Sequence, residues 1–415
     1  MRSGRQKSDN RFYLLSANNG DGFAKMKKKI ALLGSTGSIG RQTLNVIRRN
    51  PDLFEVVSLA AGNNTELLLS QAAEFSPDVI TLKSEAGLKK LNIDLKNGNN
   101  YGVKEVYFGS EAYIEAITDE ADLVVIALVG FDGLKAVLKA AEKGKDIALA
   151  NKESLVVGGK FIMDAINSSG IRLNPIDSEH SAIWQCLGFD RTTPFKKLIL
   201  TASGGAFRDK TIEELKTVTA KEALKHPNWN MGDKITVDCA TMVNKAFEVI
   251  EANRLYNADF SKIEAVMHRE SIIHSMVEFC DNSVMAQLSY PSMEIPISLA
   301  LTDGKRLAQN VDELDFFKIK TLDFEEIDGK KFPCFPIGIE AGRKGGLYPA
   351  VFNGANEAAN LAFRQGVISY PDIYAIIEGA LSAYTVKESV SLESIERANE
   401  FATGFAEKFI KNKLN

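Results

Sequence analysis

The sequence predicts an α/β protein, with an N-terminal Rossmann-like doubly wound parallel sheet, a central α/β catalytic domain and a C-terminal helical domain. Three observations predict it. A strand, a glycine turn and a helix follow one another over residues 27–49, and apolar strands then alternate with helices as far as residue 150. Residues 351–411 are rich in alanine with helical spacing. The 415 residues exceed what one hydrophobic core usually serves, so several domains are expected.

Composition narrows the possible functions. The chain is 45% hydrophobic and 25% charged, which is typical of globular proteins. No run of about 18 apolar residues occurs, so we predict no membrane partner. The net charge of −4, without a concentrated basic patch, argues against a nucleic-acid partner. The four cysteines are far apart and form no CxxC pair, which favours a reduced, cytoplasmic protein.

The beginning of the chain has a composition of its own. The first 29 residues hold eight basic and two acidic side chains. They contain neither a long apolar run nor a small-residue cleavage site, so a secretory signal is not expected. We predict a disordered basic extension over 1–25, with Met26 as an alternative start; a targeting segment is the less favoured interpretation.

The first element is a buried strand over 27–33, which leads directly into the glycine motif GSTGSIG at 34–40. A helix follows over 41–49, and Pro51 ends it. Glycines let the backbone approach a phosphate, and the helix start offers free N–H groups. We therefore predict a dinucleotide site, the alternative being a tight turn without a ligand.

The second strand, over 54–60, ends at Ala61-Gly62-Asn63-Asn64. Enzymes that use NAD commonly place an acidic residue here, and its absence favours NADP because a carboxylate would repel the 2′-phosphate. Further strands and one helix continue the alternation, which indicates a parallel sheet; the strands are expected at 78–82, 123–128 and 146–150, and the helix at 133–143.

Two groups of polar residues in the middle of the chain suggest a cation site. Asp177 and Glu179 follow a predicted strand over 171–176, and in an extended segment they point to the same side. Converging carboxylates suit Mg²⁺ or Mn²⁺, although a helix cap is the alternative. Lys245 and Glu248 share one face of a predicted helix over 238–251. They could bind a phosphate and a metal, or form a solvated ion pair.

Three further segments are candidates for ligand binding. Lys152 and Glu153 follow the strand over 146–150 and are either functional or a helix cap. Ser203 begins a Ser-Gly-Gly turn after a strand over 198–202, which suits a phosphate or is an ordinary turn. The loop 226–232, HPNWNMG, has the composition of a lid, the alternative being a buried tryptophan.

Six of these motifs, in order and spacing, resemble 1-deoxy-D-xylulose 5-phosphate reductoisomerases. The resemblance covers nearly the whole chain after the basic extension. The motifs are GSTGSIG at 34–40, ANKES at 150–154, DSEH at 177–180, SGG at 203–205, HPNWNMG at 226–232 and ATMVNKAFEVIEA at 240–252.

The resemblance implies metal-dependent isomerisation of 1-deoxy-D-xylulose 5-phosphate and its reduction by NADPH to 2-C-methyl-D-erythritol 4-phosphate, in non-mevalonate isoprenoid biosynthesis. It implies Mg²⁺ or Mn²⁺ on Asp177, Glu179 and Glu248, with Lys152 as a further catalytic residue. The residues implied to contact the substrate are Lys152, Ser178, Glu179, Ser203, His226, Trp229, Cys239, Asn244, Lys245 and Glu248. Those implied to contact NADPH are Thr36, Gly37, Ser38, Ile39, Gly62, Asn63, Asn64, Asn151, Glu153 and Gly232, and His274 also matches a histidine of the family.

Two positions depart from the family pattern. Cys239 stands where the family usually has a serine that contacts the phosphate, and a thiol is the weaker donor. Ala206 follows SGG where the family often has proline. We expect the first change to affect substrate binding and the second only to loosen the turn.

The resemblance also implies a homodimer and a domain organisation. We expect an NADPH-binding domain over 26–176, a catalytic and dimerisation domain over 177–312, a linker over 313–345 and a helical domain over 346–415. One rival function is another NADP-dependent dehydrogenase, of the semialdehyde or homoserine type, which leaves the carboxylates unexplained. A second is an inactive nucleotide-sensing scaffold, which predicts lost metal ligands.

Overall fold

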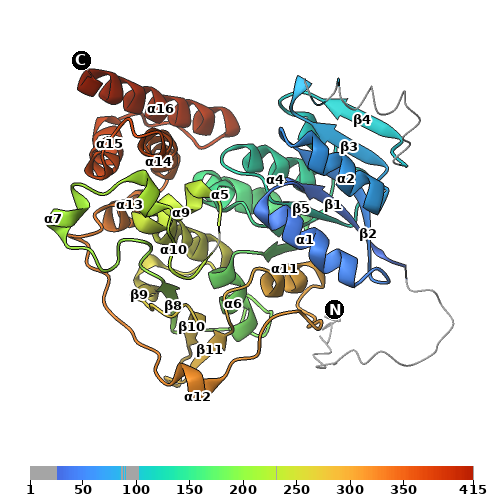
Figure 1. The fold of residues 1–415 in the computed structure, drawn as a ribbon, viewed down its shortest axis with the longest axis horizontal. Coiled ribbons are helices and arrows are strands. Elements are labelled where there is room, and N and C mark those ends of the chain that lie inside the picture. The colour runs from blue at the N-terminus through green and yellow to red at the C-terminus, as the bar shows by residue number, and fades with distance from the viewer. Residues whose placement is uncertain (1–25, 86, 88, 90–101, 230, 415) are drawn as a thin grey trace, which may run out of the picture.

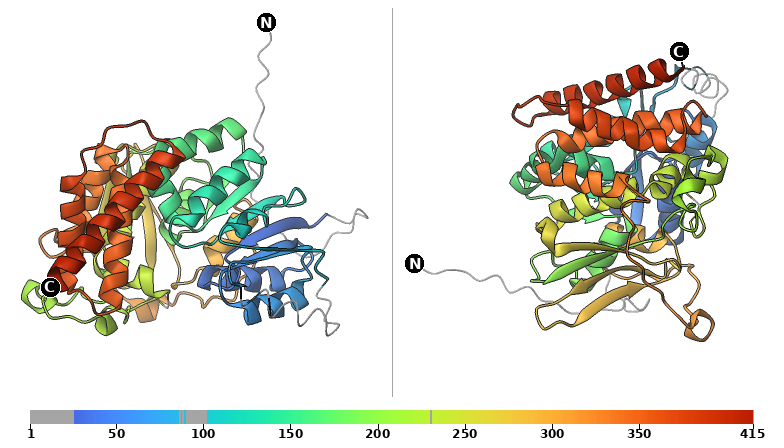
Figure 2. Two further views of the ribbon diagram at one scale, coloured as in Figure 1. Left: turned by 90° about the horizontal axis from the view of Figure 1, so that it is seen from above. Right: turned by 90° about the vertical axis from the view of Figure 1, so that its left-hand side faces the viewer.

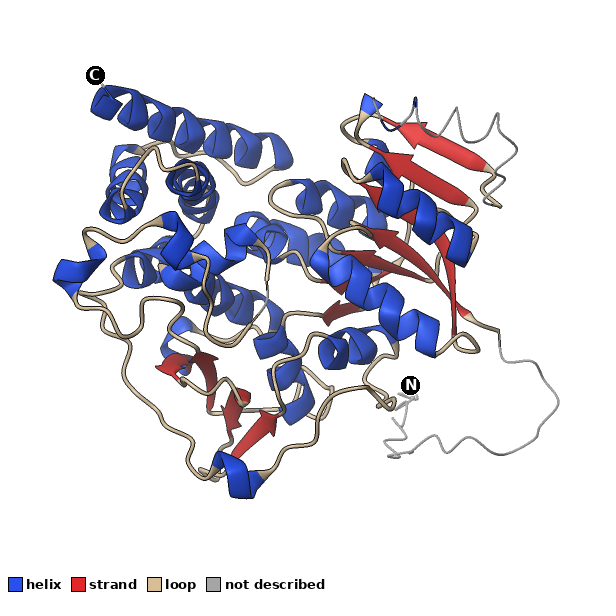
Figure 3. Cartoon of the chain, in the orientation of Figure 1, coloured by secondary structure: helices blue, strands red, loops and turns tan. Residues whose placement is uncertain are grey.

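The computed structural model describes residues 26–85, 87, 89, 102–229 and 231–414 (Figure 1). The predicted extension 1–25 lies outside the described residues. Helices and strands segregate into a parallel sheet with flanking helices, a smaller mixed sheet and a helical layer (Figure 3). The predicted fold class is confirmed.

The N-terminal region is built on a seven-stranded parallel sheet in the order β4-β3-β2-β1-β5-β6-β7. Ile30 of β1 pairs with Leu123 of β5, and both are fully buried, which explains the apolar runs in these strands. The strands are β1 (Lys28–Leu33), β2 (Phe54–Ala61), β3 (Val79–Leu82), β4 (Glu105–Phe108), β5 (Leu123–Ile126), β6 (Asp146–Leu149) and β7 (Leu173–Pro175). The strand expected over 123–128 ends at Ile126, and β4 was not predicted.

The helices between these strands are α1 (Ser38–Arg49), α2 (Thr65–Phe75), α4 (Asp132–Glu142) and α5 (Lys152–Ser169), with a short 3-10 turn, η1 (Ala112–Ile114). The glycine turn between β1 and α1 packs tightly. Gly34 has a φ of +87°, and a Cβ there would lie 2.5 Å from the carbonyl oxygen of Ala127. Glycine is therefore needed at this position even without a ligand.

The second sheet has four strands in the order β11-β10-β8-β9, namely β8 (Lys197–Ala202), β9 (Ile263–Met267), β10 (Ile273–Glu278) and β11 (Val284–Leu288). β9 and β10 follow one another in the chain but are separate strands on opposite sides of β8. Ser271, in the connection, has a φ of +53°, so the chain turns there.

The central helices are α6 (Ser178–Cys186), α9 (Asp233–Ala240) and α10 (Val243–Leu255). Helix α6 contacts both sheets, whereas α9 and α10 lie between the smaller sheet and the C-terminal helices (Figure 1). The single helix predicted over 238–251 is wrong, because the chain breaks at Thr241–Met242, where Met242 has a φ of +64°. The break redirects α10, which is buried along most of its length. Short elements around this region are α7 (Ile212–Leu215), α8 (Ala220–Ala223), η2 (Phe260–Lys262) and α11 (Glu294–Leu301).

The C-terminal part is helical, as predicted, and covers one side of the molecule (Figure 2). Its helices are α14 (Tyr348–Arg364), α15 (Tyr370–Ala383) and α16 (Leu392–Leu414). Within the predicted alanine-rich stretch, Ala355 and Ala359 are fully buried. The expected linker 313–345 contains α12 (Phe316–Ile319) and α13 (Cys334–Lys344). Among the described helices, none is both long enough and apolar enough to cross a membrane.

Candidate active site

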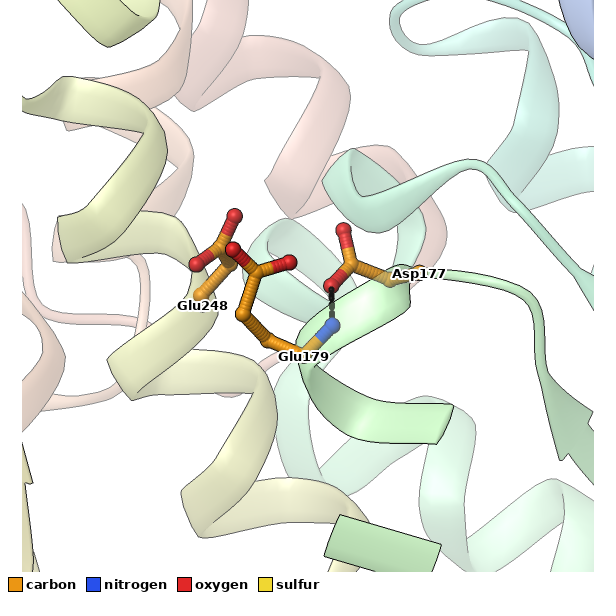
Figure 4. A group of neighbouring side chains, drawn as sticks. All are labelled: Asp177, Glu179 and Glu248. Atoms are coloured by element: carbon orange, nitrogen blue, oxygen red, sulfur yellow. Dashed lines mark hydrogen bonds between the residues drawn. The ribbon is translucent and has the colours of Figure 1, made fainter. Parts of the chain in front are cut away.

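Three carboxylates from two helices meet in the centre of the molecule (Figure 4). Asp177 follows β7 and caps α6, where its Oδ1 accepts a hydrogen bond of 3.2 Å from the backbone N–H of Glu179. Glu179 lies in the first turn of α6, and Glu248 reaches across from α10. One oxygen from each residue lies within 4.8 Å of those of the other two. Asp177 is therefore the helix cap of the alternative interpretation, and the cap also holds its carboxylate beside Glu179.

Lys152, the first residue of α5, reaches into this group. Its Nζ lies 2.8 Å from Asp177 Oδ2 and 3.2 Å from Glu248 Oε1. It also donates a hydrogen bond of 2.6 Å to Oδ1 of Asn244. Because Lys152 is buried with three partners here, it does more than begin a helix.

Lys245 and Asn244 complete the predicted face of α10. Lys245 Nζ lies 2.9 Å from Glu179 Oε1 and also pairs with Glu248. Asn244 donates from Nδ2 to Glu248 Oε1 at 2.5 Å. Glu248 is 1% exposed and Lys245 4%, which contradicts the alternative of a solvated ion pair.

Crowding of charge shifts the pKa values in this group. Burial raises the pKa of Glu179, and the neighbouring charge of Glu248 raises it further. Burial, the largest single influence, would also raise the pKa of Asp177, but the neighbouring positive charges, Lys152 foremost, together outweigh burial and hold it below the usual range. Three carboxylates face two lysines, so a bound cation would balance the remaining negative charge of the group. Its donors are all oxygens, which fits Mg²⁺ or Mn²⁺.

A second layer lies behind the carboxylates. His180 Nε2 is 3.3 Å from Glu251 Oε2, and both side chains are almost fully buried. Tyr256 donates from its hydroxyl to the carbonyl oxygen of His180 at 2.5 Å. Glu251 was not predicted as a site residue, although it lies three residues after Glu248 and so on the same side of α10.

Ser203, directly after β8, meets the loop that was predicted as a lid. His226 Nδ1 accepts hydrogen bonds from the backbone N–H groups of Asn228 and Trp229 at 3.2 and 3.0 Å. The ring proton is therefore assigned to Nε2, which donates to Ser203 Oγ at 2.9 Å. Burial and the nearby Arg208 lower the pKa of His226 to about 4, so the ring is neutral at physiological pH.

The same loop rests on β10 and the turn before it. The ring of Trp229 is half-buried, with its centroid 5.9 Å from that of His274. Nδ2 of Asn228 donates to the carbonyl oxygen of Arg269 at 2.6 Å and to Ser271 Oγ at 2.7 Å. The contact between Asn228 and Ser271 was not predicted, because a link between segments so far apart leaves no local pattern in the sequence.

A cavity of about 850 Å³ joins these groups. Its wall includes the three carboxylates and most of the predicted substrate residues, namely Lys152, Ser178, Ser203, His226, Trp229, Cys239, Asn244 and Lys245, together with His274. Burial, with the charge of Glu248, raises the pKa of Cys239, so its sulfur is present as a thiol. Residues assigned to the substrate from widely separated motifs thus face one space.

The predicted cofactor residues are gathered at helix starts along the carboxyl edge of the large sheet. Ser38, Ile39 and Gly232 line the same cavity, and Thr36, Gly62 and Asn63 lie in the turns that precede α1 and α2. Gly37, Asn64 and Asn151 are the N-caps of α1, α2 and α5. Glu153 Oε1 accepts a hydrogen bond of 2.5 Å from Lys234 Nζ. Several helix N-termini therefore surround this edge, which suits a phosphate-rich ligand.

Comparisons with known proteins agree along the chain. Residues 30–159 match the family described as 1-deoxy-D-xylulose 5-phosphate reductoisomerase, and 173–256 and 288–404 match its two C-terminal domain families. A reductoisomerase of this name from Geobacillus sp. (strain WCH70) is 47% identical over 370 residues, which cover 89% of this chain and 96% of the relative. One from Synechocystis sp. is 45% identical over 380 residues, which cover 91% of this chain and 96% of the relative.

Solved structures of the same name share the fold. A DOX-P reductoisomerase in complex with NADPH, fosmidomycin and magnesium aligns with a TM-score of 0.88 and 38% identity, over 92% of this chain and 98% of the other. The Zymomonas mobilis enzyme in complex with NADPH aligns with a TM-score of 0.85 and 38% identity, over 93% of this chain and 99% of the other.

Proposed function

The chain belongs to the 1-deoxy-D-xylulose 5-phosphate reductoisomerase family, and from that premise we propose its reaction and the residues that perform it. It converts 1-deoxy-D-xylulose 5-phosphate to 2-C-methyl-D-erythritol 4-phosphate with NADPH and a divalent cation, in isoprenoid biosynthesis. The observation that carries the proposal is the meeting of Asp177, Glu179 and Glu248 beside two buried lysines, in a cavity that reaches the glycine turn.

Asp177, Glu179 and Glu248 would hold Mg²⁺ or Mn²⁺, which when bound polarises substrate oxygens as a Lewis acid. Lys152 and Lys245 partly neutralise these carboxylates in the structure. Both ammonium groups stay protonated, because the surrounding carboxylates raise their pKa values despite burial. With a cation present, the two lysines are available to an anionic substrate without leaving a buried charge unpaired.

The remaining residues bind and enclose the substrate. Asn244, Ser203 and the Ser-Gly-Gly turn supply neutral donors for a phosphate, and Lys245 supplies the charge. His226 holds the hydroxyl of Ser203 in place through Nε2. Trp229 covers the cavity from the lid loop and excludes water. NADPH, bound along the carboxyl edge of the sheet, supplies the hydride.

We also propose that the chain works as a homodimer in the cytoplasm. Strand β11 is an edge of the smaller sheet, and Val284 and Met285 on it are more than half exposed. An exposed apolar edge strand is suited to pairing with a second copy. All four cysteines are free thiols, which fits a reducing compartment.

The test is NADPH oxidation, followed by the absorbance of the reduced nicotinamide, with 1-deoxy-D-xylulose 5-phosphate and Mg²⁺ or Mn²⁺. Turnover should require the substrate and the cation, and a chelator should stop it until the cation is restored in excess. Oxidation that persists in the chelator would contradict the metal site. No oxidation of NADPH when both the substrate and the cation are present would contradict the function.

A further inference from the structure

The turn after β2 is where selectivity between NADPH and NADH is expected to arise. In a doubly wound sheet this turn meets the adenosine ribose, and NADPH carries a 2′-phosphate there. The turn here consists of Gly62, Asn63 and Asn64, so it contains no cation to meet that phosphate. The side-chain oxygen of Asn64 is already used as the cap of α2, where it accepts from the N–H of Leu67 at 3.2 Å.

A basic residue lies beside this turn, at the end of the neighbouring strand β3. Strand β3 runs parallel to β2, with Leu82 opposite Ala61, and Lys83 follows directly after it. The backbone N–H of Lys83 donates to the carbonyl oxygens of Ala61 and Gly62, each at 3.2 Å. Lys83 is therefore anchored beside the turn. It is also the only basic residue between Arg49 and Lys89 in the sequence.

The side chain of Lys83 is accessible to a ligand. It is 52% exposed, and its Nζ lies 3.4 Å from Oδ2 of Asp132 at the start of α4. An exposed ion pair of this kind contributes about 0–1 kcal/mol, so a doubly charged phosphate can replace it. Ser84, the next residue, accepts from the N–H of Gly87 through its Oγ at 3.3 Å, which leaves its own hydroxyl hydrogen able to donate.

We propose that Lys83, assisted by the hydroxyl of Ser84, binds the 2′-phosphate of the cofactor and thereby makes the enzyme select NADPH over NADH. The proposal rests on the proposed function for the identity of the cofactor. Lys83 exchanges Asp132 for the phosphate when the nucleotide binds. Asp132 therefore competes with the ligand and holds the ammonium close to the site when no nucleotide is present.

Binding of two non-reactive fragments to the full-length protein tests this directly. Titration calorimetry compares 2′,5′-ADP, which carries the 2′-phosphate, with 5′-AMP, which lacks it. Lys83→Met should weaken 2′,5′-ADP by about tenfold or more, as expected for a lost charge-assisted hydrogen bond, and leave 5′-AMP unchanged. The matched control is Lys89→Met, an exposed lysine paired with Glu85, which should change neither.

A second variant separates charge from structure. Asp132→Asn removes the competing carboxylate, so 2′,5′-ADP should bind more tightly while 5′-AMP does not. In kinetics, the ratio of kcat/KM with NADPH to that with NADH should fall in Lys83→Met by the same factor as fragment binding. Equal weakening of both fragments, or no weakening of either, would overturn the proposal. A protein that binds the fragments as expected but never turns over the substrate would refute the proposed reaction instead.

Discussion

At the scale of single residues, the centre of this protein is a group of buried charges. Asp177, Glu179 and Glu248 lie against Lys152 and Lys245 with little contact to water. Removing charged groups from water costs several kcal/mol per ion, which mutual attraction only partly offsets. Such a group is poor support for stability, which favours a chemical role for it.

Glu248→Gln tests the role of that group. The amide keeps the shape of the side chain but removes one of three negative ligands, so turnover should fall by about a hundredfold or more. Affinity for NADPH, measured by titration, should change little because Glu248 is not among the residues predicted to contact NADPH. Glu264→Gln, an exposed carboxylate paired with Lys197, serves as the control. Equal loss of turnover and NADPH affinity would contradict this division of roles.

Cys239→Ser tests the departure from the family pattern. The thiol of Cys239 lines the cavity, and its raised pKa keeps it a neutral, weak donor. A hydroxyl is smaller and donates more strongly, so the KM for 1-deoxy-D-xylulose 5-phosphate should stay the same or fall. The measurement is a substrate titration at saturating NADPH. A clear rise in KM would show that the thiol itself is required.

At the scale of elements, function depends on where helices begin and where they break. Asp177 and Asn151 cap α6 and α5, which places Glu179 and Lys152 in first turns that face the cavity. The break at Met242 redirects α10 so that Lys245 and Glu248 face these first turns. The loop 226–232 is attached to the turn before β10 by the side chain of Asn228.

Asn228→Ala tests that attachment. The change removes the hydrogen bonds to Arg269 and Ser271, so the loop that carries Trp229 should be less often closed. We expect the KM for the substrate to rise severalfold, while the melting temperature changes little because the loop is at the surface. Lys225→Ala, an exposed residue before the same loop, is the control. An unchanged KM would show that closure does not need this attachment.

At the scale of the whole molecule, the helical layer is joined to the active-site region by a buried ionic cluster. Lys234 Nζ of α9 lies 3.3 Å from Asp238 Oδ2 and 3.9 Å from Glu357 Oε1 of α14. Asn356 and Asn360 of α14 both donate to Asp238 Oδ1 at 2.8 Å. Burial raises the pKa of Glu357 to about 7, against the opposing charge of Lys234.

Glu357→Gln should therefore act on stability in a pH-dependent way. The unfolded chain loses this proton near the ordinary value of 4.5 and the folded chain near 7, so Glu357 costs stability as pH rises through that window. At pH 8 the variant should be more stable than the parent, by about 1–3 kcal/mol, and near pH 4.5 the two should agree. Denaturant unfolding at both pH values measures this. Glu400→Gln, exposed on α16, is the control, and a destabilised Glu357 variant at pH 8 would contradict the pKa shift.

The amino-acid sequence alone determined the fold class, the glycine turn and the main motifs. Each of these is local: apolar period, glycine spacing and cap residues act within a few positions of one another. It also predicted that Asp177 and Glu179 would converge, although the extended segment assumed for them is wrong, because Glu179 lies in the first turn of α6. The roles of the individual site residues remain predictions.

Only the tertiary structure decided how distant segments meet. It brought Asn228 to Ser271 and Lys83 to the turn after β2. It placed Glu248 beside Asp177, which the local patterns did not indicate and only the family resemblance implied. It also placed the helix break at Met242 and the turn between β9 and β10, where packing overrides local preference. The physical reason is that these contacts join residues many positions apart, and their free energy depends on burial and charge pairing that exist only once the chain has folded.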